Sequence, residues 1–176
     1  MKKILIAACM LTTACAIAAE TKPAQAQAKG ATASAELKNA EGKKVGDVTL
    51  RETPNGIIAT VKVTGIPKGE HAFHIHEVGK CEPPFTTAGA HYNPAGHQHG
   101  IENPKGKHAG DLPNLHIEKE GPLEVTVFLD DVSFSGKNPL FDKDGSAFVI
   151  HAGADDYSSD PAGNAGGRIA CGVLTK

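Results

Sequence analysis

Residues 48–63, VTLRETPNGIIATVKV, contain the clearest structural signal in the chain. Side chains alternate in polarity from Val48 to Thr53, the pattern stops at Pro54-Asn55-Gly56, and it resumes from Ile57 to Val63. A period of two is typical of a β-strand with one buried face, and a break at Asn-Gly is typical of a hairpin turn. The stretch therefore predicts an antiparallel β-hairpin.

Further strand patterns follow along the chain. Residues 123–129 also alternate, and residues 147–151 and 168–174 are short apolar strands. Glycine and proline occur at intervals between these segments, and we find no convincing amphipathic helix of useful length. Short strands separated by turn residues predict an all-β sandwich or barrel. Two stretches rich in Gly, Pro, Asp, Asn or His do not fit the strand pattern, residues 77–113 and 152–167, and long loops of this kind are usually functional or disordered.

The first nineteen residues predict a secretory signal peptide. Lys2 and Lys3 precede an apolar run from Ile4 through Ala19, which is shorter than the ~20 residues that a membrane span needs. The alternative is a lipoprotein anchor at Cys15 or Cys9, but Ala16 and Ala18, three and one residues before a possible cut, favour ordinary cleavage. Residues 20–30 predict a flexible leader, and we expect the globular domain to cover residues 31–176.

Removal of the signal peptide would leave two cysteines, Cys81 and Cys171. In an exported domain such a pair predicts one disulfide, and the alternative is two buried free thiols. The formal net charge of the full chain is only −2, with no basic stripe and few aromatic residues, so nothing indicates nucleic acid binding.

Histidines are numerous, nine in all, and their placement is informative. In the predicted strand 70–76, Phe73 and Ile75 point to the core face, and His71 points with them. His74 and His76 point together to the other face, where both imidazoles could reach one metal ion. We therefore expect His71 to be a hydrogen-bonded core residue and the other two to be candidate ligands.

A second cluster follows in the long loop. Three imidazoles and one carboxylate form a closed tetrahedral set suited to zinc. Spacing alone leaves open which three histidines of this loop would serve. His151, which ends a short apolar strand, would complete a nitrogen-rich site with His74 and His76, and imidazole ligands suit copper. The candidates in the loop are His91, His97, His99, His108 and Asp111.

Several motifs of the chain resemble those of the Cu/Zn superoxide dismutases. Residues 69–77, GEHAFHIHE, resemble the copper-binding signature of that family, and residues 163–172, GNAGGRIACG, resemble its second signature. The segments AGAHYNP (88–94), QHG (98–100) and HAGDL (108–112) match the loop between them. The resemblance covers nearly all of residues 31–176.

The resemblance implies a set of site residues. His74, His76 and His151 would bind copper, and His91 would bridge copper and zinc. His99, His108 and Asp111 would complete the zinc site, which excludes His97. Asp155 matches the carboxylate that hydrogen-bonds a copper-ligand and a zinc-ligand histidine, Arg168 matches the active-site arginine, and Cys81 with Cys171 matches the family disulfide.

The resemblance also implies a fold and an activity. The fold would be an eight-stranded Greek-key β-barrel or sandwich, and each subunit would hold one copper and one zinc ion and disproportionate superoxide. The loop from Asp155 to Arg168 is short and contains no lysine, unlike that of animal members. Bacterial periplasmic members differ in these loops, so we expect a periplasmic enzyme. The sequence leaves open which residues attract the anion and whether the protein forms a homodimer.

Three other functions stay open at this point. Metal storage is one, although the exported chain would carry no methionine and no cysteine outside the predicted disulfide, and carriers of Cu(I) favour sulfur ligands. A catalytically inactive relative is another. A zinc hydrolase is the third, but it needs an open zinc position, which four protein ligands would fill.

Overall fold

The computed structural model describes residues 30–118 and 121–176. The predicted signal peptide and most of the predicted leader lie outside these residues. The regular secondary structure of the described residues consists of β-strands and one short 3₁₀ turn, η1 (Thr86–Ala88). The strands are β1 (Thr32–Asn39), β2 (Lys44–Thr53), β3 (Gly56–Val63), β4 (Gly69–His71), β5 (Phe73–His76), β6 (Leu115–Ile117), β7 (Leu123–Leu129), β8 (Ala147–His151) and β9 (Arg168–Val173).

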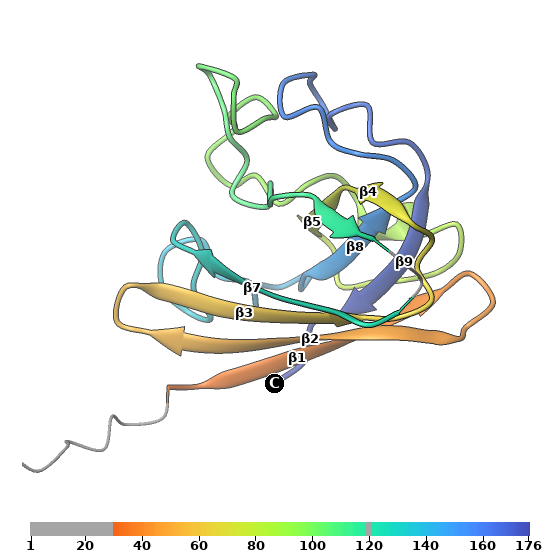
Figure 1. Ribbon diagram of the computed structural model, residues 1–176. Helices are drawn as coiled ribbons and strands as arrows, with labels where there is room; N and C mark the ends of the chain where they lie inside the picture. Colours follow the sequence, from red (N-terminus) through yellow and green to blue (C-terminus); the bar gives the residue numbers. More distant parts are fainter. Residues whose placement is uncertain (1–29, 119–120) are drawn as a thin grey trace, which may run out of the picture.

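The strands form a curled antiparallel sheet (Figure 1). Seven strands are hydrogen-bonded in the order β5-β8-β9-β1-β2-β3-β7, and β4 pairs with β6. Most neighbours are not consecutive in the chain, since β3 pairs with β7 and β1 pairs with β9. Long connections of this kind are typical of a Greek-key arrangement. The predicted all-β Greek-key fold is confirmed.

The predicted strand 70–76 is interrupted at Ala72. The Ala72 N–H donates to the Gly153 carbonyl at 2.8 Å, while the Ala72 carbonyl accepts from the His151 N–H at 2.9 Å. These bonds mark the point where the chain changes its pairing partner. Before Ala72, β4 pairs with β6, and after Ala72, β5 pairs with β8. If β4 and β5 are counted as one bent strand, the fold has the eight strands that the sequence resemblance implies.

The predicted hairpin is present with a two-residue turn. Thr53 pairs with Gly56, so Pro54 and Asn55 form the loop between β2 and β3. Gly56 has φ +144°, and a Cβ atom there would lie 2.4 Å from the Leu129 carbonyl oxygen of the neighbouring strand. The turn therefore needs glycine both for its backbone angle and for the close approach of β7.

One main core fills the inside of the curled sheet. Alternate residues of β1, β2 and β3 point into it, as the period-two pattern predicts, and Phe73 stacks on Phe148 with ring centroids 5.3 Å apart. A small second cluster lies around the ring of Phe85, beside Ala147 and Val149 of β8. This second cluster lies next to the arginine described below.

The two long loops meet at one side of the sheet, at the top of Figure 1, where they appear in green and blue. The Glu102 N–H donates to the Tyr157 carbonyl at 3.0 Å, and the His99 N–H donates to Asp160 Oδ1 at 2.7 Å. These contacts bring the histidine-rich loop against the loop that follows β8. Within the described residues, no helix is long and apolar enough to cross a membrane.

Candidate metal centre

His71, His74 and His76 have different surroundings although they lie within six residues. His71 is buried, with Nδ1 2.8 Å from the His151 carbonyl oxygen and Nε2 2.9 Å from the Pro67 carbonyl oxygen. Both of its ring nitrogens thus face backbone acceptors. His71 is a hydrogen-bonded core residue that ties β4 to the end of β8, and it has no nitrogen left for a metal.

Four histidines converge on one point from β5, the long loop and β8. Their ligand atoms all lie within 4.8 Å of one another, and all four side chains are buried. Each has one ring nitrogen without a hydrogen-bond partner, and a buried unpaired nitrogen is costly unless something binds it. The four unpaired atoms are His74 Nδ1, His76 Nε2, His91 Nε2 and His151 Nε2.

The second nitrogen of each ring is fixed by a protein acceptor. His76 Nδ1 donates to the Gly89 carbonyl at 3.0 Å, and His151 Nδ1 lies 3.3 Å from the Gly166 carbonyl. His74 Nε2 donates to Asp155 Oδ2 at 2.8 Å. Partners of this kind set the tautomer, so that the lone pair of the other nitrogen faces the shared point. The donor set, four imidazole nitrogens, fits copper.

A second group surrounds one carboxylate oxygen. Asp111 Oδ1 lies 2.9 Å from His91 Nδ1, 3.0 Å from His99 Nδ1 and 3.2 Å from His108 Nδ1. The last contact lacks hydrogen-bond geometry, since His108 Nδ1 has no partner. Ligands ~2.0 Å from a tetrahedral zinc ion are separated by roughly 3.3 Å, close to these distances. Three imidazoles and one carboxylate therefore fit a closed zinc site.

Both groups contain His91. Its Nδ1 belongs to the Asp111 group and its unpaired Nε2 belongs to the four-histidine group. His97 belongs to neither group, because its exposed ring faces the Lys107 carbonyl at 3.1 Å. Folding therefore distinguishes His97 from the other loop histidines, which spacing could not do.

The Asp155 carboxylate hydrogen-bonds one histidine of each group. Its Oδ2 accepts from His74 Nε2 and its Oδ1 accepts from His99 Nε2 at 2.9 Å. The Asn114 side chain holds the backbone of Asp155, since its Oδ1 accepts from the Asp155 N–H and its Nδ2 donates to the Asp155 carbonyl, both at 2.9 Å. Asn114 has no sequence signal of its own, and only the fold brings it to Asp155.

Burial keeps most of the four-histidine group neutral. It lowers the pKa of His76 to about 2 and that of His151 to about 3, with help from neighbouring histidines and from Arg168. Burial also lowers the pKa of His91 to about 4, although Asp111 opposes the shift. A neutral imidazole is the form that binds a metal. At neutral pH these rings are ready to act as ligands.

Two nearby carboxylates, those of Asp111 and Asp155, raise the pKa of His99 instead of lowering it. Burial lowers its pKa, but the nearby Asp111 and Asp155 outweigh burial and raise it to about 9. Burial raises the pKa of Asp111, yet the three histidines around its carboxylate hold that pKa well below its usual range. Two buried carboxylates thus attract positive charge to this point, and a metal cation would take the place of the proton on His99.

Arg168, the first residue of β9, lies beside the four-histidine group. Its Nη1 donates to the Phe85 carbonyl and its Nη2 to the Gly89 carbonyl, both at 2.6 Å. Burial lowers the pKa of the guanidinium, which nevertheless remains charged at neutral pH. Cys81 and Cys171 form the predicted disulfide, which ties β9 to the loop that supplies both carbonyls.

A sequence profile of the family described as copper/zinc superoxide dismutase (SODC) matches residues 44–174, three quarters of the chain. The protein "Superoxide dismutase [Cu-Zn] 2" of Aquifex aeolicus is 50% identical over 146 residues, which are 81% of this chain and 85% of that protein. The chain belongs to the copper/zinc superoxide dismutase family. "Superoxide dismutase [Cu-Zn]" of Caulobacter vibrioides is 41% identical over 147 residues, 81% of this chain and 84% of that protein.

Two solved structures that resemble this chain do not carry the plain name of the enzyme. A crystal structure of a "SOD-like protein" from Bacillus subtilis matches with a TM-score of 0.76 at 41% identity, and covers 80% of this chain and 96% of that one. A structure of "the clock protein EA4" matches with a TM-score of 0.72 at 33% identity, and the match covers 86% of this chain and 98% of that one. Family membership therefore gives the fold, and the activity must be argued from this chain's own residues.

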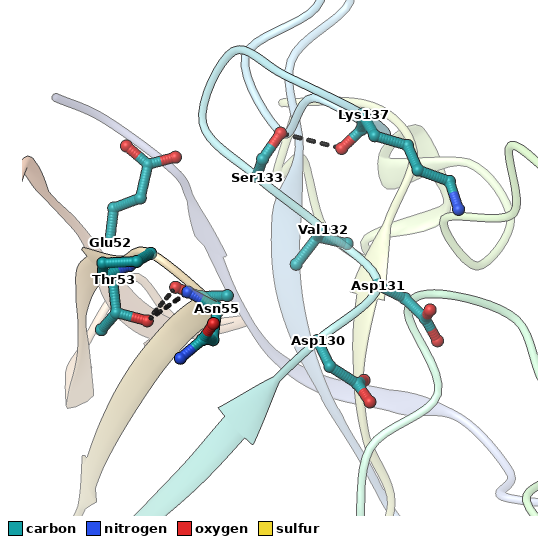
Figure 2. A pocket seen from close by; sticks show the side chains of 10 residues that line it. Glu52, Thr53, Asn55, Asp130, Asp131, Val132, Ser133 and Lys137 are labelled. Carbon is teal, nitrogen blue, oxygen red and sulfur yellow. Dashed lines mark hydrogen bonds between the residues drawn. The ribbon is translucent and has the colours of Figure 1, made fainter.

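A separate surface pocket of about 280 Å³ lies between the β2–β3 turn and the segment after β7 (Figure 2). Two of its polar side chains form hydrogen bonds within their own turns: Thr53 Oγ1 donates to the Gly56 carbonyl at 2.8 Å, and Ser133 Oγ donates to the Lys137 carbonyl at 2.8 Å. No histidine and no member of either metal group lines it. We assign it no part in the chemistry of the family.

Proposed function

We propose that this protein is a superoxide dismutase that converts two superoxide anions and two protons into O₂ and hydrogen peroxide. The observation that carries the proposal is the pair of buried groups that share His91: four unpaired ring nitrogens face one point in the first group, and three imidazole nitrogens surround Asp111 Oδ1 in the second. Storage of one metal needs no such bridge. Copper would be held by His74, His76, His91 and His151, and zinc by His91, His99, His108 and Asp111.

Copper, when bound, supplies the electron transfer by alternating between its two oxidation states, whereas zinc has no redox chemistry. Arg168 provides the charge that attracts and orients the anion, since its guanidinium is fixed by two neutral carbonyls. His91 Nε2 is the atom that takes up a proton and gives it to the product. The contacts of His91 Nδ1 keep the ring in place while this happens.

One subunit supplies every group in this scheme. With the two groups sharing His91, each subunit would hold one copper and one zinc ion, and a homodimer would hold two such centres. The disulfide fits an oxidising compartment outside the cytoplasm. Together with the sequence of residues 1–19, it supports export to the periplasm rather than attachment through a lipid.

The test is metal content and superoxide turnover measured on the same purified sample. We expect copper, zinc and fast turnover in the unmodified protein. His151→Ala should lose copper and turnover together, while Arg168→Ala should keep both metals and turn over roughly tenfold more slowly, about the value of one hydrogen bond to a charged group. Exposed His116 lies outside both groups, so His116→Ala is the matched control and should change neither.

Three other results would contradict the copper assignment or favour a different function. Full activity in the His151→Ala variant would show that the copper assignment is wrong. Copper without turnover would favour metal storage, and zinc with ester hydrolysis would favour a hydrolase.

A further inference from the structure

Phe85 lies between the disulfide and the guanidinium of Arg168. Phe85 is 2% exposed and belongs to a small buried cluster with Ala88, Ala147, Val149 and Cys171, and Cys81 packs against this cluster. This cluster is separate from the main core. The ring of Phe85 is the largest side chain in it, so the position of this loop segment depends on how that ring packs.

The backbone of Phe85 has an uncommon conformation. Its φ of 68° and ψ of 15° lie in the left-handed region, which a bulky non-glycine residue rarely adopts and which persists only where the surroundings fix it. The Phe85 N–H donates to the Glu82 carbonyl at 2.6 Å, and the Phe85 carbonyl accepts from Ala88 N–H at 3.2 Å. The same carbonyl oxygen receives Arg168 Nη1 at 2.6 Å.

The way in which Arg168 is held matters for an anionic substrate. Among the described residues no carboxylate pairs with it, and its two short contacts are to carbonyl oxygens. A carboxylate would fix the guanidinium but also neutralise it. A carbonyl fixes the direction of the N–H groups and leaves the positive charge for the substrate.

We propose that Phe85 is a positioning residue for Arg168: its buried ring holds a left-handed turn that directs its carbonyl at the guanidinium. This inference rests on the proposed function, because it takes Arg168 to be the group that receives superoxide. Phe85 itself touches neither the substrate nor a metal. Loss of the ring should therefore reduce anion binding and turnover without removing copper or zinc.

The informative variant is Phe85→Gly. Glycine adopts a positive φ without strain and keeps the carbonyl, so this change removes the ring that holds the turn without adding backbone strain. We measure azide affinity of the metal-loaded protein by optical titration, together with turnover and metal content. Azide affinity and kcat/KM should each fall roughly tenfold, the size of one lost charge-assisted hydrogen bond. Metal content should stay unchanged.

Two further variants separate positioning from general damage. Phe85→Leu keeps an apolar side chain in the cluster and should recover most of the azide affinity. Phe134 is equally buried but lies in the main core, so Phe134→Leu is the matched control and should leave azide affinity unchanged. In the double variant with Arg168→Ala, Phe85→Gly should add almost no further loss, because both changes act through the same guanidinium.

The outcomes distinguish this inference from the proposed function. Normal azide affinity and turnover in Phe85→Gly, with both reduced in Arg168→Ala, would overturn the role of Phe85 alone. Additive losses in the double variant would also overturn it. No effect of Arg168→Ala would instead overturn the proposed role of Arg168 in the activity.

Discussion

His76 and Arg168 share one acceptor, the carbonyl oxygen of Gly89, which lies 3.0 Å from His76 Nδ1 and 2.6 Å from Arg168 Nη2. One backbone group thus sets the tautomer of a candidate copper ligand and the direction of the candidate substrate-binding arginine. The geometry of the two should therefore change together when this carbonyl is displaced.

Gly89→Ala is expected to weaken copper binding and to slow turnover in the same variant. Gly89 has φ +76°, and a Cβ atom there would lie 2.9 Å from Glu77 Cγ. With ψ at −155° this backbone lies in a region that is almost exclusive to glycine, which costs another residue ~1–3 kcal/mol, and the close contact adds to it, so the carbonyl should shift. Copper affinity by chelator competition, with turnover on the same sample, checks this.

Gly42→Ala is the control for that variant. Gly42 has nearly the same φ, +79°, but no atom lies within 4 Å of its added Cβ, and it lies in the turn between β1 and β2. Gly42→Ala should lose stability because of this positive φ, without any change in copper affinity. Equal copper affinity in the two variants would show that the shared carbonyl has no role.

Asp155→Asn should weaken copper binding by roughly 10- to 100-fold, the usual effect of changing a partner of a metal-bound histidine. The carboxylate accepts from both His74 and His99, whereas an amide presents one acceptor and one donor, and the donor would face a ring N–H. Calorimetric titration of the metal-free protein with copper measures the change.

Asp156→Asn is the neighbouring control for this substitution. The exposed Asp156 carboxylate accepts the backbone N–H groups of Ser158 and Ser159 through Oδ1, a role that an amide oxygen also performs. Its copper affinity should equal that of the unmodified protein. Asp155→Asn would refute the bridging role if it bound copper as tightly as Asp156→Asn does.

His97→Ala should retain zinc, whereas His99→Ala and His108→Ala should lose it. The ring of His97 is exposed and faces the Lys107 carbonyl, while the other two rings lie against Asp111 Oδ1. Zinc per subunit, measured by atomic emission after dialysis, distinguishes them. Zinc loss in the His97→Ala variant would assign that histidine to the site instead.

The metal-free protein should lose stability as the pH rises from about 6.5 to about 9. The pKa of His99 is raised to about 9 in the folded protein and is near 6.5 in the unfolded chain, so the folded state binds the proton more tightly. The stabilisation is fully present below pH 6.5 and is lost as pH passes 9.

Urea unfolding at pH 6.5 and 9.5 measures this loss, and zinc-loaded protein is the comparison. Zinc displaces the proton from His99, so the loaded protein should not show this decline over the same range. A metal-free protein whose unfolding free energy stays constant across that range would contradict the raised pKa of His99.

Strand patterns were readable where large apolar residues alternate. The bounds predicted for residues 123–129 and 147–151 are those of β7 and β8. β1 was not predicted, because its inward face is formed mainly by Ala33 and Ala35, which give little hydrophobic contrast. The break at Ala72 was also missed, since it arises from hydrogen bonds to residues 151 and 153, about eighty positions along the chain.

The amino-acid sequence by itself determined the all-β class, the disulfide pair and the types of donor, because alternation and ligand chemistry are properties of the residues. It also placed His74 and His76 on one face of a strand and His71 on the other. Only the tertiary structure separated His97 from His99 and His108 by direct contact. It alone brought Asn114 to Asp155, and the Phe85 and Gly89 carbonyls to Arg168. Every residue has a carbonyl, so a backbone acceptor leaves no mark in the sequence, and these contacts join segments about 40 to 80 residues apart that meet only when the sheet curls.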